Sequence, residues 1–292
     1  MNTGRGLPLL EITGLAKTYG EGRGATRAIA ELSFSVREGE LVSVVGPSGC
    51  GKTTMLRCVA GLLVPSGGEV RLRGRPVVSP PPEMAFVFQD YSRSLMPWLS
   101  VRDNVELPLR HKRELSRRER RIRVEDAVSS VGLARHLDRY PWQLSGGMQQ
   151  RVAIARALAY QPEILLMDEP FASVDAQARA DLEDLVLQVQ AAYGVTILFV
   201  THDIDEAVYL SDRVVVLTRP PTTVQETVSV RLPRPRDQVS TKELPEFARL
   251  RAHVFRGIKR QMAAAPEPEA GTSGGRLPGE LEARESAATG GQ

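Results

Sequence analysis

The sequence predicts an α/β fold built on a mainly parallel sheet, with an inserted α-helical subdomain. Short apolar runs, typical of buried parallel strands, recur along the chain. They occupy residues 41–45, 84–89, 164–167, 196–200 and 214–217. Helical segments are expected between several of these runs, and such alternation favours a parallel sheet covered by helices. The chain has 292 residues, 42% hydrophobic and 25% charged, which is typical of a globular protein with a substantial core.

The first strands are expected near the N-terminus, where residues 9–12 and 32–36 partly alternate apolar and polar side chains. A glycine-rich segment then ends the strand at 41–45, and residues 52–61 have the pattern of a helix. Between about 95 and 160 the chain carries Arg-rich stretches and no strong strand pattern, which indicates the inserted helical subdomain. A further helix is expected over residues 176–193.

The C-terminal part is expected to contain an amphipathic helix followed by a tail. Large apolar side chains recur every three or four residues within the segment 236–262. They are Leu244, Phe247, Leu250, Val254 and Ile258. Residues 263–292 consist largely of Ala, Gly, Pro, Glu and Ser, and this composition predicts a disordered tail.

Bulk properties exclude several classes of protein. No stretch approaches eighteen consecutive apolar residues, so no transmembrane helix is expected. The N-terminus lacks the apolar run of a signal peptide. The two cysteines, Cys50 and Cys58, form neither a disulfide framework nor a metal-binding spacing, which suits a reducing cytosol. A net charge of +3 gives no general indication of nucleic-acid binding.

A glycine-rich motif marks a candidate phosphate-binding loop. Residues 46–53 match G-x-x-x-x-G-K-[ST], and they follow a strand and open a helix, as the motif requires. Its glycines allow backbone N–H groups to surround phosphate oxygens, Lys52 would reach the β- and γ-phosphates, and Thr53 would ligate Mg²⁺. The predicted nucleotide contacts are Gly46, Pro47, Ser48, Gly49, Cys50, Gly51, Lys52, Thr53 and Thr54. The alternative is a glycine turn that only joins a strand to a helix. We also hypothesise that the Cys50 thiol makes the protein sensitive to alkylation.

Two carboxylates follow the strand predicted at residues 164–167. Strands of such a sheet end beside the phosphate loop, so Asp168 would hold Mg²⁺, through water. Glu169 would take a proton from the water that attacks the γ-phosphate. The alternative is a pair of acids that simply ends a strand in solvent. Together with the loop, the pair indicates an ATP-hydrolysing P-loop NTPase with Mg²⁺ as cofactor.

The segment Leu144–Arg151, LSGGMQQR, resembles the signature sequence of ABC ATPases, with Met148 in place of the usual Gln. It lies about twenty residues before the acid pair, as the family pattern requires. The resemblance covers roughly residues 9–235 and implies an ABC ATPase domain with an antiparallel β-subdomain. It also implies two cassettes in head-to-tail contact. Ser145, Gly146 and Gly147 of one cassette would bind the γ-phosphate held by the other.

Further site residues are implied by matching the family position by position. Tyr19 matches the aromatic residue that stacks on adenine. Gln89 matches the Q-loop residue, which lies near Mg²⁺ and the attacking water. Asp175 matches the D-loop aspartate, although residues 171–175 depart from the commoner Ala-Leu-Asp pattern. His202 matches the switch histidine that contacts the γ-phosphate.

Local strings resemble the nitrate, sulfonate and taurine import branch of the family. They lie at residues 95–105, 140–143, 203–214 and 232–237. The branch implies a peripheral subunit on the cytoplasmic side of the inner membrane. Its partners would be transmembrane permease subunits, a second ATP-binding subunit and, indirectly, an extracytoplasmic solute-binding protein.

The sequence also bears on three other interpretations. A non-transport ABC ATPase acting on DNA is disfavoured because fewer than a hundred residues separate loop and signature, without sustained heptads. One acting on ribosomes would carry two cassettes in one chain, whereas this sequence contains one. An exporter cassette stays open, because some exporters do not fuse cassette and membrane domain. For the Arg-rich stretch Arg110–Arg123, a solvated helix face near a membrane surface is preferred over nucleic-acid binding.

Overall fold

The computed structural model describes residues 8–90 and 94–263. Its strands are β1 (Pro8–Tyr19), β2 (Thr26–Arg37), β3 (Leu41–Val45), β4 (Gly67–Leu72), β5 (Arg75–Pro76), β6 (Met84–Val87), β7 (Ile164–Asp168), β8 (Thr196–Val200), β9 (Arg213–Leu217) and β10 (Thr222–Ser229). Its α-helices are α1 (Lys52–Val59), α3 (Val101–Glu106), α4 (Arg117–Ser130), α5 (Gly146–Ala159), α6 (Ala176–Tyr193), α7 (Ile204–Leu210) and α8 (Pro245–Ala263). Short 3-10 turns lie at Gly22–Gly24, Leu107–His111, Ala134–His136 and Pro141–Gln143.

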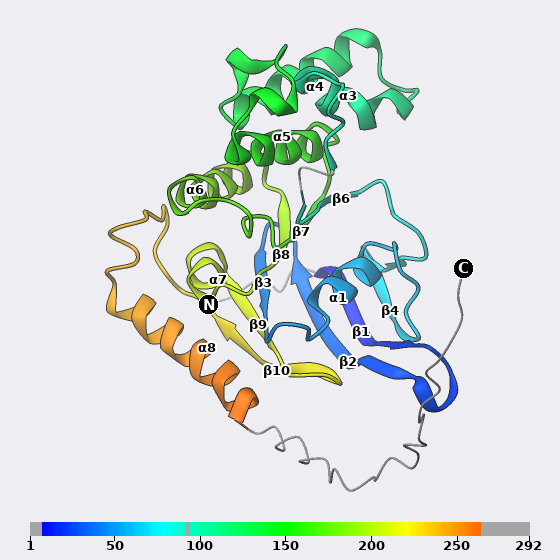
Figure 1. Ribbon diagram of the computed structural model, residues 1–292, viewed down its shortest axis with the longest axis vertical. Helices are drawn as coiled ribbons and strands as arrows, with labels where there is room; N and C mark the ends of the chain where they lie inside the picture. The colour runs from blue at the N-terminus through cyan, green and yellow to red at the C-terminus, as the bar shows by residue number, and fades with distance from the viewer. Residues whose placement is uncertain (1–7, 91–93, 264–292) are drawn as a thin grey trace, which may run out of the picture.

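The strands form one sheet in the order β5-β4-β1-β2-β10-β9-β3-β8-β7-β6. From β9 to β6 all neighbouring strands pair in parallel. In this half β3, β7 and β8 are buried along their whole length, because helices cover both faces (Figure 1). The predicted α/β fold with a mainly parallel core sheet is confirmed.

The other end of the sheet is antiparallel and more extensive than the sequence indicated. β1 and β2 are 12-residue strands that pair with each other, and β1 also pairs with β4. The stretches expected at 9–12 and 32–36 cover only parts of them. Register shifts within the β1–β2 pair break the alternation of apolar and polar side chains, which explains why the sequence pattern is weak there.

β4, β5 and β10 were not anticipated. β5 has two residues, and β10 carries a largely polar sequence, TTVQETVS. Neither has the apolar run by which a strand is recognised, and each is held by pairing with a neighbour.

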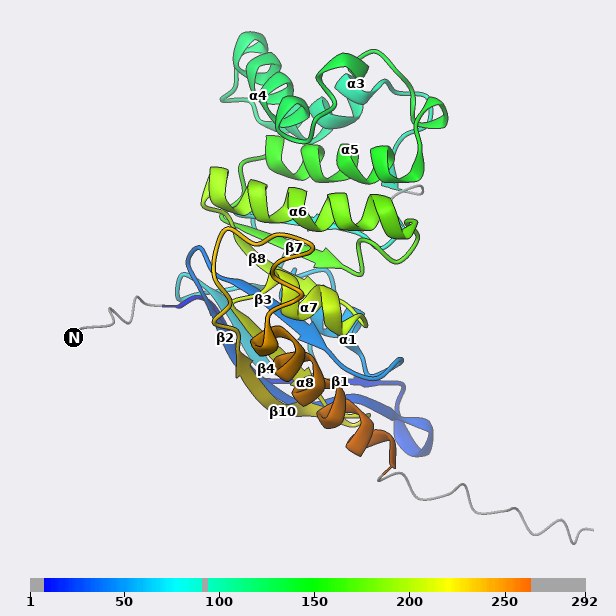
Figure 2. The same ribbon diagram turned by 90° about the vertical axis from the view of Figure 1, so that its left-hand side faces the viewer.

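The helices form layers on the sheet. α3, α4 and α5 pack together as a unit beyond α6, and α6 lies between this unit and the sheet (Figure 2). α4 begins with a capping box in which Ser116 and Glu119 exchange side-chain-to-backbone hydrogen bonds. The helices of this unit share one buried cluster with α6 and α7, while α1 packs in a second cluster against β1. The two clusters occupy opposite faces of the sheet.

α8 lies beside α7 and β9 and presents Phe247, Leu250 and Val254 to the core. It begins at Pro245, after a stretch of turns, and it ends at Ala263, the residue at which the tail was expected to start. The remaining tail, 264–292, lies outside the described residues. Among the described residues, no helix combines the length and the apolar character needed to cross a bilayer.

Gly68 is expected to be essential to the antiparallel end of the sheet. It has a φ of +72°, and a Cβ there would lie 2.1 Å from the carbonyl oxygen of Gly14. Gly68→Ala should therefore lower the free energy of unfolding by about 3 kcal/mol or more, measured by urea denaturation. Gly74 is the matched control, because its φ of +75° is similar but nothing lies within 4 Å of a Cβ. Gly74→Ala should lose only about 1–2 kcal/mol. Equal losses in the two variants would contradict the clash.

Candidate active site

Most of the predicted site residues gather at one edge of the sheet. β3, β8, β7 and β6 are parallel neighbours, so their C-terminal ends meet at the same edge. The segments that leave these ends carry the phosphate loop, His202, the Asp168–Glu169 pair and Gln89, respectively. A hollow of ≈ 490 Å³ opens here, lined by Ser48, Gly49, Cys50, Gly51, Lys52, Thr53, Thr54, Glu169 and His202.

The phosphate loop is a compact turn between β3 and α1. Gly49 and Gly51 have φ values of +75° and +90°, which other residues adopt only with strain. A Cβ on Gly46 would lie 2.9 Å from the Cys50 Sγ and 3.0 Å from the Leu217 Cβ, so packing also requires glycine there. The backbone N–H groups at the start of α1 have no side-chain cap and carry the positive end of the helix dipole. The loop is therefore suited to an anion.

Lys52 is a buried cation with incomplete charge compensation. Its Nζ donates hydrogen bonds to the carbonyl oxygens of Gly46 at 3.1 Å and Pro47 at 3.4 Å. The nearest carboxylate oxygen recorded for it belongs to Glu169, 3.7 Å away. A buried ammonium held mainly by neutral carbonyls favours an additional negative ligand in the adjoining hollow.

Thr53, which lines the hollow, contacts the buried Asp168 just behind it. The Thr53 hydroxyl donates to the Asp168 carboxylate at 3.0 Å. Burial raises the pKa of Asp168, although the hydrogen bond from Thr53 opposes this change. A cation at this point would relieve the cost of the buried carboxylate, and hydroxyl and carboxylate oxygens are the ligands that Mg²⁺ prefers. The donor set therefore fits Mg²⁺.

Glu169 is contacted from three directions. His202 Nδ1 lies 3.0 Å from its Oε2, Gln89 Nε2 donates to the same oxygen at 3.4 Å, and Lys52 approaches Oε1. Its backbone has a φ of +42°, which is rare for a side chain that is not glycine. Such strain is commonly kept at functional positions. It turns the carboxylate away from the line of β7 and toward the hollow.

Tyr19 and Thr54 extend the site beyond the phosphate loop. Tyr19 lies at the end of β1, and its hydroxyl is 3.2 Å from the Thr54 Oγ1. The residue is 44% exposed, and Lys17 Nζ is 5.3 Å from the ring centroid. An accessible aromatic ring beside the loop is placed where a base could stack.

The signature residues and Asp175 do not line the hollow. Ser145 caps α5 by accepting a hydrogen bond from the Met148 N–H, and α5 belongs to the helical layer, away from α1 (Figure 1). A Cβ on Gly147 would lie 3.1 Å from the Ala178 Cβ, so this glycine allows α5 and α6 to approach closely. Asp175 caps α6 through the N–H of Ala178. The hollow within one chain therefore contains no contribution from the signature.

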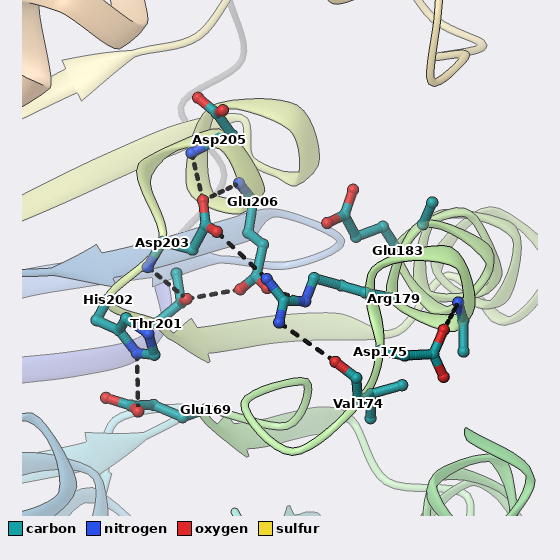
Figure 3. Close-up of polar contacts among 12 residues, drawn as sticks. Glu169, Val174, Asp175, Arg179, Glu183, Thr201, His202, Asp203, Asp205 and Glu206 are labelled. Carbon is teal, nitrogen blue, oxygen red and sulfur yellow. Dashed lines mark hydrogen bonds and ion pairs between the residues drawn. The ribbon is translucent and has the colours of Figure 1, made fainter. Parts of the chain in front are cut away.

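Three polar residues near His202 were missed by sequence reasoning. They are Thr201, Arg179 and Glu206. Glu206 accepts a hydrogen bond from the Thr201 hydroxyl and lies within ion-pair distance of Arg179, as Figure 3 shows. Glu206 precedes the fully buried run 207–210. An acidic residue beside so apolar a run is a signal that could have been noticed, but its partner Arg179 could not be identified from spacing.

Comparisons with known proteins agree with this geometry. The ABC transporter family model matches residues 29–172. The nitrate transport protein NasD of Klebsiella oxytoca is 42% identical over 251 residues, covering 85% of this chain and 95% of that protein. The nitrate import ATP-binding protein NrtD of Synechococcus elongatus is 42% identical over 265 residues, covering 90% and 94%.

A solved structure has a similar fold over about three quarters of this chain. It is the dimeric, post-hydrolysis structure of the ATP-binding cassette MJ0796 bound to ADP and Pi. The match has a TM-score of 0.67 at 35% identity and covers 76% of this chain and 99% of that chain.

Cys50 is expected to resist alkylation, contrary to the hypothesis drawn from its position in the loop. The residue is fully buried, and burial raises the pKa of its thiol, which lowers the thiolate fraction. The folded chain should therefore incorporate N-ethylmaleimide at Cys50 at least about tenfold more slowly than the urea-unfolded chain, followed by peptide mass spectrometry. Cys58, also buried with a raised thiol pKa, provides an internal comparison. Rapid labelling of Cys50 in the folded chain would contradict this expectation.

Proposed function

The chain belongs to the ATP-binding subunits of ABC transporters, and on this premise we propose that it energises uptake of a small anionic solute such as nitrate, a sulfonate or taurine. It hydrolyses ATP as the motor subunit of an importer, and its similarity to nitrate import proteins favours this reading over an exporter or a non-transport ATPase. The proposal rests most directly on the convergence of Lys52, Glu169 and His202 on one hollow.

We assign the proton-accepting role to Glu169. Its carboxylate is turned into the hollow and is held by His202 and Gln89, so its position is fixed before a substrate arrives. Lys52 and the N–H groups of the phosphate loop would neutralise the charge that develops on the transferred phosphoryl group. His202 would contact the γ-phosphate from the far side of Glu169. Its side chain is 56% exposed, so it is accessible to a ligand.

Thr53 and Asp168 would hold Mg²⁺, with Gln89 nearby. When bound, the ion would neutralise charge on the β- and γ-phosphates. Within residues 8–90 and 94–263, no group of three or more His, Cys, Asp or Glu is arranged to bind a metal. Phosphate oxygens and water would therefore complete the coordination, as Mg²⁺ commonly requires.

A second copy would complete the nucleotide site. Ser145, Gly146 and Gly147 lie outside the hollow of their own chain, yet they present the N-terminus of a 14-residue helix suited to an anion. In a head-to-tail dimer they would bind the γ-phosphate held by the partner, with Asp175 near the same interface. The similar cassette MJ0796 has been solved as a dimer.

The partners and the solute of the motor subunit are also part of the proposal. We propose that it docks on transmembrane permease subunits at the cytoplasmic face of the inner membrane. An extracytoplasmic solute-binding protein would deliver the solute. Nitrate is favoured because the relatives NasD and NrtD are named for nitrate transport.

Replacement of Glu169 should separate binding from hydrolysis. Glu169→Gln removes the base but keeps the size of the side chain, so kcat for ATP should fall by about 10²-fold or more. Binding of ATP, followed by a fluorescent analogue, should be retained. Glu163→Gln is the matched control, because Glu163 precedes the same strand at its opposite end and pairs with Arg73 at the surface. ATPase activity of Glu169→Gln within about threefold of the parent chain would contradict the assignment of the base.

The solute can be tested by uptake in cells that lack this gene. Cells deprived of the chain should lose high-affinity uptake of labelled nitrate, and the unaltered gene should restore it. A gene encoding Glu169→Gln should not restore uptake, since the motor would bind ATP without turning over. Labelled taurine, an alkylsulfonate and bicarbonate are measured in parallel. Loss of sulfonate or taurine uptake alone would replace nitrate as the solute, and no loss for any anion would contradict the proposal.

A further inference from the structure

An arginine at the start of α6 connects three loops near the reaction centre. The Arg179 Nη2 donates to the carbonyl oxygen of Val174 in the D-loop, residues 171–175, at 3.3 Å. Its Nη1 lies 3.6 Å from Asp203 Oδ2, and its Nε lies 3.7 Å from Glu206 Oε1. Figure 3 shows the guanidinium between the D-loop and the start of α7. The side chain thus joins the segment after β7 to the segment after β8.

Glu206 holds the segment that carries His202 in place through a hydrogen bond to Thr201. Its Oε2 accepts a hydrogen bond of 2.6 Å from the Thr201 hydroxyl, and the Thr201 oxygen accepts one of 2.9 Å from the Asp203 N–H. The residues before and after His202 are therefore both held by this network. The His202 ring in turn contacts Glu169 at 3.0 Å (Figure 3).

We propose that Arg179 and Glu206 are positioning residues for ATP hydrolysis, which couple the D-loop at Val174 to the placement of His202. The inference rests on the proposed roles of His202 and Glu169. Neither Arg179 nor Glu206 lines the hollow. Both would act on the orientation of the histidine through Thr201 and Asp203.

The network is loose enough to respond to movement of the D-loop. The two ion-pair distances of Arg179 exceed hydrogen-bond length, and within the described part of the chain its buried Nε has no hydrogen-bond partner. A shift of the D-loop by less than about 1 Å would bring these groups into or out of hydrogen-bond distance. Asp175 of this loop is expected at the dimer contact. Dimer formation would therefore change the placement of the His202 side chain through Arg179 and Glu206.

Glu206 is not required merely to form α7. Asp203 already caps that helix, because its Oδ1 accepts hydrogen bonds from the N–H groups of Asp205 and Glu206. Burial raises the pKa of Glu206 to about 7. The carboxylates of Asp203 and, on α6, Glu183 also contribute to this raised pKa, whereas Thr201 and Arg179 oppose it. Above pH 7 the folded protein would therefore be more stable with a neutral side chain at this position. The carboxylate of Glu206 is kept at a cost in folding stability.

A double-mutant cycle on the purified full-length chain tests the coupling. Arg179→Ala and Glu206→Gln should each lower kcat for ATP about tenfold, with KM changed by less than about twofold. The double variant should be no slower than the slower single variant, because both changes break the same connection. Effects that multiply in the double variant, or single variants within about twofold of the parent kcat, would overturn the proposal.

Thermal stability distinguishes positioning from a structural role. The folded-state pKa of Glu206 is raised, so the parent chain loses stability as pH rises through about 7. Glu206→Gln should therefore raise Tm relative to the parent chain more at pH 8 than at pH 5.5, while kcat falls. A lower Tm at pH 8 together with unchanged kcat would identify a structural role and overturn the proposal.

Arg213→Ala is the matched control. Arg213 pairs with Glu40 at the start of β9, at the edge of the sheet opposite to the site. Its loss should lower Tm without changing kcat per folded molecule. Glu169→Gln, measured alongside, keeps the two ideas separate. If it abolishes turnover while the Arg179 and Glu206 variants remain fully active, the coupling fails and the proposed base stands. If it retains turnover, the proposed base itself fails.

Discussion

The carboxylate of Glu169 is the point at which four strands of the parallel sheet act together. Lys52 approaches it from the helix after β3, Gln89 from the segment after β6 and His202 from the segment after β8, while Glu169 itself follows β7. These contacts depend on parallel pairing, which aligns the C-terminal ends of the strands. The left-handed backbone of Glu169 then turns the carboxylate toward its partners.

The site is also organised by charges that are buried at a cost. Lys52, Asp168 and Glu206 are each at most 5% exposed, and none is fully compensated by a close opposite charge. Groups of this kind destabilise a fold unless a ligand or a network compensates them. Lys52 lines the hollow and Asp168 contacts Thr53 at its wall, so triphosphate and Mg²⁺ would compensate them. Glu206 faces the protein interior, where Thr201 and Arg179 do so in part.

The two layers of the molecule carry different parts of the proposed site. The sheet and its loops build the hollow, whereas the unit α3–α5 carries the signature on a separate surface beyond α6 (Figure 2). α6 connects them: its cap is Asp175, its first turns contain Arg179, and Ala178 packs on Gly147. A movement of one layer relative to the other would therefore displace both the signature and the network that holds His202.

The sequence alone determined the parallel core and the segments that carry chemistry, because contiguous apolar strands and a phosphate loop are local patterns. The positions of Lys52, Thr53, Asp168 and Glu169 followed from them, with Gln89 and His202 supplied by family resemblance. Tertiary structure alone decided the length of β1 and β2, the existence of β4 and β10, the burial of Cys50 and the contact of Arg179 with Glu206. Strand pairing with a distant partner and packing between α6 and α7 are non-local interactions, and no short stretch of sequence records which residues they bring together.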